Sequence, residues 1–479
     1  MKMKICSIIC AICLLLGLVF TFSSCNSDDA VGIVSAQINE NGELILAYSN
    51  GNEQNLGVVV GKDGEAGKDG ADGKDGADGK DGADGKDGAD GKDGVNGKDG
   101  VDGNDGKDGS LGSLTVTSSG SSIPAASAKG LRSAVRIICK FKATVQYGGW
   151  GPGSGSTTER EYSSEGSGVI YKMDQAEGDA FIITNYHVVY DASSNSANNI
   201  STDISVYLYG SEISEKTIKA TYVGGSLYYD IAVLRVEDSE LLKASSACAV
   251  DVADSDKIVV GDSAIAIGNA QGLGISSTSG IVSVDSEHIT MTAADGKTEV
   301  SFRVMRVDTA INSGNSGGGL YDDEGKLIGI VNAKIIYDGV ENIGYAIPSN
   351  VAVSIAQNII DYCYGTDTER VQRALLGITV STSDSKAVYD SATGLMRIEE
   401  TVCVYEVGSG SLADGILQAG DILVSATVNG STTEITRQYH IIDLMLDVRV
   451  NDVVTLKILR GGAEQSVSIT VTEGCLTAY

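Results

Sequence analysis

The sequence of 479 residues predicts a mainly β protein preceded by a glycine-rich stalk. Between residues 131 and 365, short β-branched runs alternate with Gly, Asn, Asp and Ser, which is typical of an antiparallel barrel or sandwich. Glycine also recurs at every third position from Gly61 to Gly109, the period of the collagen triple helix. The expected strands of the β region are residues 168–173, 180–184, 204–209, 231–236, 258–267, 281–284, 302–307 and 327–331.

The amino end has the pattern of a secretory signal. A basic start is followed by an apolar run over residues 5–22 and by Ser23-Ser24-Cys25, so residues 1–24 are expected to be a signal peptide. The pattern resembles a bacterial lipobox, with Phe22 where Leu is usual, and Cys25 would be lipidated. An uncleaved anchor is the alternative, because about 18 apolar residues can span a bilayer. Either reading predicts an extracytoplasmic, membrane-anchored protein.

Residues 25–60 are expected to form a small β or linker segment, with a strand at 43–48 between two turns. The glycine repeat at 61–109 predicts a collagen-like triple helix and therefore a homotrimer, with a flexible hydrated linker as the alternative. A calcium-binding β-roll fits less well, because its period is nine. A Ser/Gly/Ala linker over 110–130 follows the repeat.

Composition narrows the function further. The net charge of -29 argues against nucleic acid as a partner, because the positive charge that neutralises phosphates is missing. Only three histidines are present, His187, His288 and His440, so no metal site or cofactor is expected. Beyond Cys25, the five cysteines are odd in number and widely spaced, and give no disulfide framework that can be assigned.

Three stretches carry candidate chemistry. Ser316 lies in the glycine-rich stretch 311–319, whose turns can expose a hydroxyl and point N–H groups inward, as a nucleophile and its oxyanion hole require. His187 directly follows an apolar strand and can exchange a proton near neutral pH. Asp230 stands at the start of another apolar strand. Taken singly, each fits a plain hairpin loop, a structural histidine or a turn residue.

Together, the order His187, Asp230, Ser316 is that of the chymotrypsin-type triad. The chain resembles the HtrA/Deg trypsin-like serine proteases in many blocks that follow the family's order. These blocks are residues 166–170, 184–189, 230–233, 268–269 with 272–274, 278–282, 308–312, 314–318 and 344–350. The resemblance implies a chymotrypsin-like double β-barrel over residues 131–365.

The resemblance also implies residue roles. Ser316 would attack the scissile carbonyl, His187 would act as base and then acid, and Asp230 would orient the imidazole. Gly314, Asn315 and Ser316 would form the oxyanion hole. The apolar Ala310 and Ile311 would lie at the specificity pocket, so cleavage after aliphatic residues is expected. The chain departs from the family at Gly319, where Pro is usual, and in an insertion at 192–199.

Residues 371–479 resemble a PDZ domain, an α+β unit. Leu376, Gly377 and Ile378 match its carboxylate-binding loop, which captures peptide C-termini while the peptide adds as a strand. A block at 415–423 and a helix at 437–447 fit the same domain, with His440 on or beside the groove helix. Residues 453–460 and 466–471 are expected to close it as strands.

The combined prediction is a membrane-tethered extracytoplasmic serine endopeptidase of the quality-control type. It would cut unfolded or misassembled proteins, and its PDZ domain would bind exposed C-termini. Two rival functions remain: a catalytically idle chaperone or binding protein of the same fold, and a surface stalk or adhesin whose working part is the collagen-like run.

Overall fold

The computed structural model describes residues 33–38, 43–48, 52–58, 122–147, 156–211, 216–333 and 343–478. The predicted signal, Cys25 and the glycine repeat lie outside these residues. The chain divides into two compact units, Met1–Gly106 and Lys107–Tyr479. No helix in the described ranges has the length and apolar character needed to cross a membrane.

The first unit contains a three-stranded antiparallel sheet, in the order β1-β2-β3. Its strands are β1 (Ile33–Ile38), β2 (Glu43–Tyr48) and β3 (Glu53–Val58). The strand predicted at 43–48 is β2.

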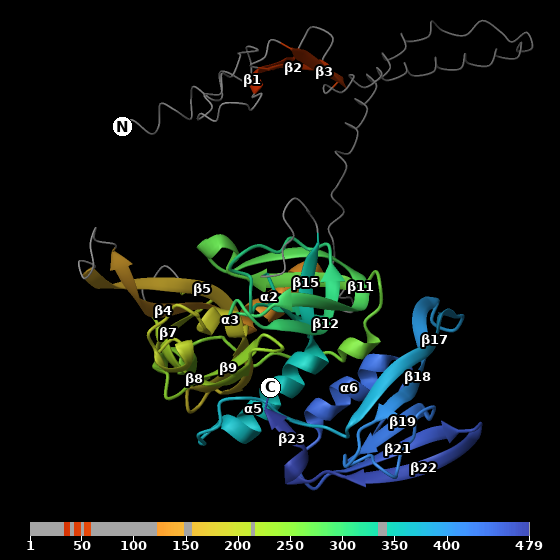
Figure 1. Ribbon diagram of the computed structural model, residues 1–479. Helices are drawn as coiled ribbons and strands as arrows, with labels where there is room; N and C mark the ends of the chain where they lie inside the picture. Colours follow the sequence, from red (N-terminus) through yellow and green to blue (C-terminus); the bar gives the residue numbers. More distant parts are fainter. Residues whose placement is uncertain are drawn as a thin grey trace, which may run out of the picture. The chain divides into compact units, whose positions relative to one another are not determined.

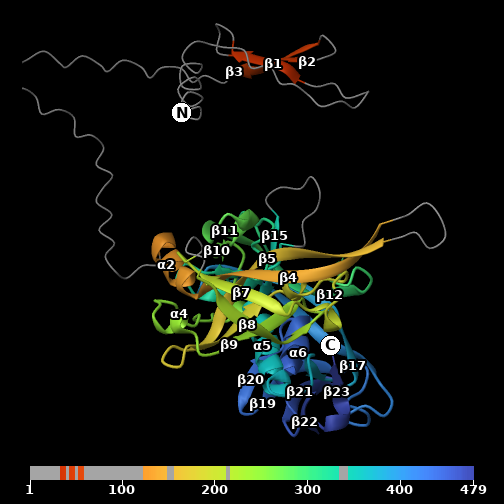
Figure 2. The ribbon, with the colours of Figure 1, turned by 90° about the vertical axis from the view of Figure 1, so that its left-hand side faces the viewer.

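The second unit begins with a closed barrel of six antiparallel strands, in the order β4-β5-β6-β9-β8-β7 (Figure 1). These strands are β4 (Ala134–Tyr147), β5 (Ser156–Asp174), β6 (Asp179–Thr184), β7 (Asp203–Leu208), β8 (Ile218–Ser226) and β9 (Ile231–Val236). Their buried apolar side chains form the barrel interior. Beyond the barrel, β4 and β5 continue as a two-stranded ribbon (Figure 2).

A second closed barrel has the order β10-β11-β12-β15-β14-β13. It contains β10 (Ser263–Gly268), β11 (Ser276–Thr292), β12 (Glu299–Val307), β13 (Gly319–Tyr321), β14 (Leu327–Val331) and β15 (Gly344–Pro348). The strand predicted at 258–267 starts only at Ser263, because Gly261 turns the chain at a φ of 99°. The two barrels confirm the predicted double β-barrel.

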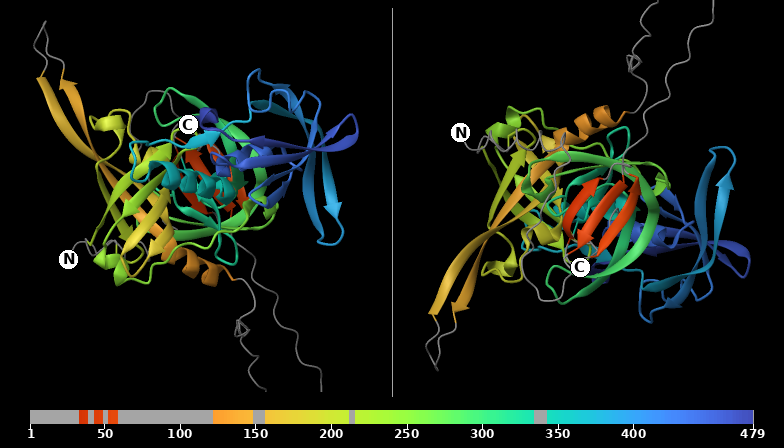
Figure 3. Two further views of the ribbon diagram at one scale, coloured as in Figure 1. Left: turned by 90° about the horizontal axis from the view of Figure 1, so that it is seen from below. Right: turned by 90° about the horizontal axis from the view of Figure 1, so that it is seen from above.

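Helices cover the ends of the barrels. Ser122 caps α2 (Ile123–Ser133), which packs so closely on the second barrel that a Cβ on Gly130 would lie 2.6 Å from Ile267. The helix α5 (Ser349–Cys363) follows Pro348 and lies under the barrels (Figure 3). The shorter helices are α3 (Tyr186–Val189), α4 (Glu240–Lys243), η1 (Ala197–Asn199), η2 (Ser255–Lys257), η3 (Ala270–Gly272) and η4 (Glu473–Cys475).

The carboxyl-terminal part is an α+β unit with its own apolar core. Its main sheet has the order β17-β18-β19-β21-β22, and β16 pairs with β23. The predicted strand 466–471 begins earlier, at Ala463, because Gly461 and Gly462 form a tight turn with positive φ. The elements are β16 (Gln372–Ala374), β17 (Ile378–Asp390), β18 (Leu395–Val407), β19 (Ile422–Val428), β20 (Ser431–Glu434), α6 (Gln438–Asp447), β21 (Val453–Arg460), β22 (Ala463–Thr470) and β23 (Leu476–Ala478).

Candidate active site

His187 and Asp230, which lie far apart in sequence, meet in the first barrel. His187 lies in the short helix α3, directly after β6, and Asp230 lies directly before β9, the strand that pairs with β6. The His187 Nδ1 lies 2.6 Å from the Asp230 Oδ2, and the His187 N–H donates to Oδ1 at 2.9 Å. With the ring proton on Nδ1, Nε2 is left free to accept a proton.

Asp230 is fixed by further donors. The buried Asn332 donates from Nδ2 to the Asp230 Oδ2 at 2.9 Å, and the Asn185 Nδ2 donates to the Asp230 carbonyl at 2.8 Å. Asp230 takes a φ of 54°, a left-handed conformation that aspartate tolerates better than most residues. Asn332 is absent from the sequence prediction. Its only sequence signal is an amide at the end of the otherwise apolar strand β14.

In the loop that carries Ser316, the carbonyl groups of residues 312–316 are all hydrogen-bonded. Ser167 anchors it twice: its Oγ donates to the Gly314 carbonyl at 2.7 Å, and its N–H donates to the Ser316 carbonyl at 2.8 Å. Three more carbonyls accept hydrogen bonds: that of Asn312 from the Asn315 N–H, that of Ser313 from the Gln271 N–H, and that of Asn315 from the Gly318 N–H.

This pattern leaves two N–H groups available. Within the described part of the chain, the N–H groups of Gly314 and Ser316 have no protein acceptor. Two unbonded backbone donors beside a serine hydroxyl can stabilise an oxyanion that forms there, because the donors are already oriented.

Two glycines allow this conformation. Gly314 has a φ of 94°, and a Cβ there would lie 2.2 Å from the Asn269 carbonyl oxygen. Gly317 has a φ of 82°, and its Cβ would lie 2.3 Å from both the Ser167 carbonyl oxygen and the Thr184 hydroxyl. Such contacts exclude any side chain. The loop is therefore locked against the strands that precede His187.

Ser316 itself is 6% exposed. Among the described residues, no hydrogen bond joins its hydroxyl to His187. Catalytic hydrogen bonds are often long in unliganded sites and tighten when substrate binds.

Ala310 and Ile311 lie directly upstream of this loop. The Thr278 hydroxyl donates to the Ala310 carbonyl at 3.0 Å. Ile311 packs on Gly344, where a Cβ would lie 2.5 Å from the Ile311 Cδ1. Their role in a specificity pocket stays a prediction.

The predicted carboxylate-binding loop lines a cavity of about 160 Å³ between β17 and α6. Gly377 has a φ of 77° and a carbonyl bonded to the Gly408 N–H at 2.8 Å. Leu376, Gly377, Ile378 and Met445 are among the lining residues. His440 lies on α6 but is not among them; its Nδ1 accepts from the Thr436 N–H at 3.2 Å.

Metal and disulfide chemistry receive no support from the described residues. No group of His, Cys, Asp and Glu side chains in those ranges could hold a metal ion. The cysteines described are all unpaired: Cys139, Cys248, Cys363, Cys403 and Cys475.

Comparisons with known proteins agree with this geometry. Residues 166–330 match the trypsin-like peptidase domain, and residues 59–114 match the collagen triple helix repeat. Serine protease Do-like HtrA from Lactococcus lactis subsp. lactis (strain IL1403) is 33% identical over 337 residues, which cover 68% of this chain and 75% of that protein. The protein of the same name from Bacillus subtilis (strain 168) is 32% identical over 351 residues, which cover 72% of this chain and 71% of that protein.

Among solved structures, the HtrA-type protease AlgW with decapeptide is 26% identical, with a TM-score of 0.45, covering 73% of this chain and 98% of that one. The family match over residues 59–114 confirms that the glycine repeat is collagen-like. The match over residues 166–330 and the two HtrA relatives confirm the predicted protease resemblance. The chain belongs to the HtrA family of trypsin-like serine endopeptidases.

Proposed function

We propose that this endopeptidase works outside the cytoplasm, with Ser316 as nucleophile, His187 as general base and Asp230 as the group that orients the imidazole. The observation that carries the proposal is the Ser316 loop, where the carbonyl groups of residues 312–316 are bonded while the N–H groups of Gly314 and Ser316 stay open. Two relatives from Escherichia coli (strain K12), DegQ and DegP, are named as periplasmic endoproteases.

Each side chain has a defined task in the reaction. The His187 Nε2 removes the proton from the Ser316 hydroxyl as its oxygen attacks the carbonyl carbon of the substrate. Asp230, 2.6 Å from Nδ1, stabilises the imidazolium that forms. The oxyanion is bound by the N–H groups of Gly314 and Ser316, in a loop shaped by Asn315. His187 then returns the proton to the leaving amine, and water repeats the sequence to release the acyl group.

Substrate selection is proposed at two places. Ala310 and Ile311 would receive an aliphatic side chain of the substrate, because neither offers a charge or hydrogen-bond donor to a polar one. The cavity at Leu376, Gly377 and Ile378 would bind the C-terminus of an unfolded or misassembled protein, with its carboxylate at the loop and its chain along β17. Support comes from the apolar lining and the free edge of β17.

The anchoring and assembly are proposed from sequence. Lipidation of Cys25 would attach the protein to a membrane, and the collagen-like run would wind three chains together as a spacer. The basis is the lipobox-like pattern before Cys25 and the match of residues 59–114 to collagen repeats.

The test compares the wild type with Ser316→Ala and with Ser313→Ala, an exposed serine of the same loop. Casein should be cleaved by the wild type and by Ser313→Ala but not by Ser316→Ala. A fluorophosphonate probe should label the peptide that contains Ser316. Equal casein cleavage by the wild type and Ser316→Ala would refute the assignment.

A second function has one observation in its favour, the lack of a hydrogen bond between Ser316 and His187 in the described ranges. A catalytically idle chaperone of this fold would hold unfolded casein without cutting it. It would show no fluorophosphonate labelling even with substrate peptides present, whereas an enzyme at rest would become labelled when such peptides bind.

A further inference from the structure

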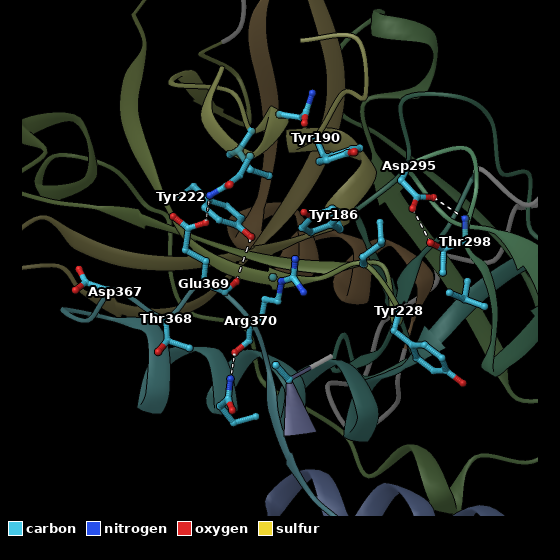
Figure 4. A pocket seen from close by; sticks show the side chains of 18 residues that line it. Tyr186, Tyr190, Tyr222, Tyr228, Asp295, Thr298, Asp367, Thr368, Glu369 and Arg370 are labelled. Atoms are coloured by element: carbon cyan, nitrogen blue, oxygen red, sulfur yellow. Dashed lines mark hydrogen bonds between the residues drawn. The ribbon is translucent and has the colours of Figure 1, made fainter. Parts of the chain in front are cut away.

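A cavity lies between the first barrel and the segment that follows α5. It has a volume of about 820 Å³, within the range of small-molecule sites. We call it the tyrosine cavity, after Tyr186, Tyr190, Tyr222 and Tyr228, which line it together with residues 367–370 of the segment that leads into the carboxyl-terminal unit (Figure 4).

The wall formed by this segment is held in place by its backbone. The Gly225 N–H donates to the Glu369 carbonyl at 3.0 Å, and Gln372 donates from its side chain to the Arg370 carbonyl at 3.1 Å. The Tyr222 hydroxyl approaches the Glu369 carbonyl at 3.5 Å. With the backbone fixed, the Arg370 side chain points into the cavity, towards Tyr186 (Figure 4).

Some polar side chains of the cavity already have hydrogen-bond partners, and others have none. Asp295 already accepts from the N–H groups of Lys297 and Thr298, both at 2.9 Å, and from the Thr298 hydroxyl at 2.6 Å. Glu369 accepts from the Asn198 side chain at 2.6 Å. In contrast, the Arg370 guanidinium has no acceptor among the residues that the structure describes. Asp295 and Glu369 thus already hold donors, whereas Asp367 and the Arg370 guanidinium have no partner among the described residues.

The tyrosines add flat surfaces and further donors. The rings of Tyr186 and Tyr190 stack, with centroids 5.2 Å apart and an interplanar angle of 26°. Burial raises the pKa of Tyr186 to about 12, so its hydroxyl keeps its proton at neutral pH. Neither hydroxyl has a hydrogen-bond acceptor within the described ranges.

We propose that the tyrosine cavity binds a small carboxylate that carries an aromatic ring. The carboxylate would form a two-point ion pair with Arg370, whose planar fork matches its geometry. The ring would stack against Tyr186 or Tyr190, in the offset or edge-to-face arrangement that aromatic pairs adopt. The lining also holds three carboxylates, those of Asp295, Asp367 and Glu369. The proposal therefore rests on the open guanidinium of Arg370 and not on the net charge of the cavity.

The test measures binding of phenylacetate and of its uncharged analogue phenylacetamide to the full chain by isothermal titration calorimetry. We expect phenylacetate to bind at least about tenfold more tightly, since a charge-assisted pair with a guanidinium is lost in the amide. Arg370→Gln should remove this preference. Tyr190→Leu should weaken both ligands and keep the preference, because it removes only a ring.

Arg397→Gln is the matched control, because Arg397 is an exposed arginine on β18, outside the cavity, and its loss changes the net charge equally. It should leave both affinities unchanged. Equal binding of the two ligands to the wild type, no measurable binding of either, or the same loss in Arg397→Gln as in Arg370→Gln would each overturn the proposal. Ser316→Ala should bind phenylacetate like the wild type, so the result is independent of the proposed peptidase chemistry.

Discussion

At the scale of single residues, Asp230 is the most constrained member of the proposed site. Its left-handed backbone, with a φ of 54°, costs on the order of 1 kcal/mol or more. That conformation turns its carbonyl towards the Asn185 amide and its carboxylate towards His187 and Asn332. These hydrogen bonds offset the backbone strain. They also fix the position of His187 through both its ring Nδ1 and its backbone N–H.

The first prediction concerns Asn332. Asn332→Ala should lower kcat/KM for a peptide substrate by about 10- to 100-fold, because Asp230 loses a charge-assisted donor worth roughly 1.5–3 kcal/mol. KM should change little, since Asn332 contacts Asp230 rather than substrate. The measurement is steady-state kinetics against pH.

Asn332→Ser, which keeps a donor, should recover part of the lost activity. If Asn332→Ala retains full kcat/KM with an unchanged pH profile, the carboxylate does not depend on this amide.

The second prediction separates the effect of a steric clash from that of a strained backbone, by placing alanine at two glycines with positive φ. Gly314→Ala should abolish most activity, because its Cβ would lie 2.2 Å from the Asn269 carbonyl and must displace the loop. Gly274→Ala is the control: its φ of 104° is equally unfavourable, but a Cβ there meets nothing within 4 Å. It should lose only about 1 kcal/mol of stability. Casein cleavage and thermal unfolding of both variants provide the measurement; similar activity in the two would contradict the argument.

Single residues also show which parts of the proposed site could be predicted from the sequence and which could not. His187, Asp230 and Ser316 each stand at a strand end or in a glycine-rich turn, so local patterns and their order pointed to them. Asn332 and Ser167 act on residues more than a hundred positions away. No local pattern encodes such a contact, because it exists only once both barrels have closed.

At the scale of elements, α6 is joined to the second barrel through a buried arginine. The Arg303 side chain on β12 is 3% exposed and pairs with Asp256 at 2.9 Å and with Asp443 of α6 at 2.6 Å. Its guanidinium lies 3.4 Å from the ring centroid of Tyr439. The sequence predicted a strand at 302–307 and a helix at 437–447, but nothing local in either segment indicates that the two meet.

The third prediction follows from Asp443. Burial raises the pKa of this carboxyl from 3.8 to about 6, although Arg303 opposes the shift. The folded protein therefore binds this proton more tightly than the unfolded chain between about pH 4 and pH 6. Linkage then requires the contribution of Asp443 to the unfolding free energy to fall as pH rises through that window.

The measurement is urea unfolding of wild type and Asp443→Asn at several pH values. The wild type should lose stability relative to the variant as pH rises from 4 to 6, because the variant has no carboxyl to titrate. Burial lowers the pKa of His288 and His440, which contributes the opposite trend, but both histidines are present in each protein and cancel in the difference. Parallel curves would show that Asp443 titrates normally.

At the scale of the whole molecule, the collagen-like run and the peptidase are separable. The compact unit Lys107–Tyr479 begins near the end of residues 59–114, so assembly and chemistry should respond to different changes. The period of the repeat was readable because glycine alone fits a triple-helix axis.

The fourth prediction is that the full chain is a trimer by light scattering and that deleting residues 61–109 yields a smaller species. Fluorophosphonate labelling of Ser316 should persist after the deletion, because none of the contacts described around that serine involves the repeat. A deletion variant that keeps the mass of the full assembly would place the contacts between copies elsewhere.

Closure of both barrels has a final consequence. Where the strands close on themselves, no edge is left unpaired, although the β4–β5 ribbon beyond the first barrel keeps open edges. In the described part of the second unit, the open flanks of the main carboxyl-terminal sheet belong to β17 and β22. An extended peptide can therefore add as a strand at β17, the edge that borders the predicted carboxylate-binding loop.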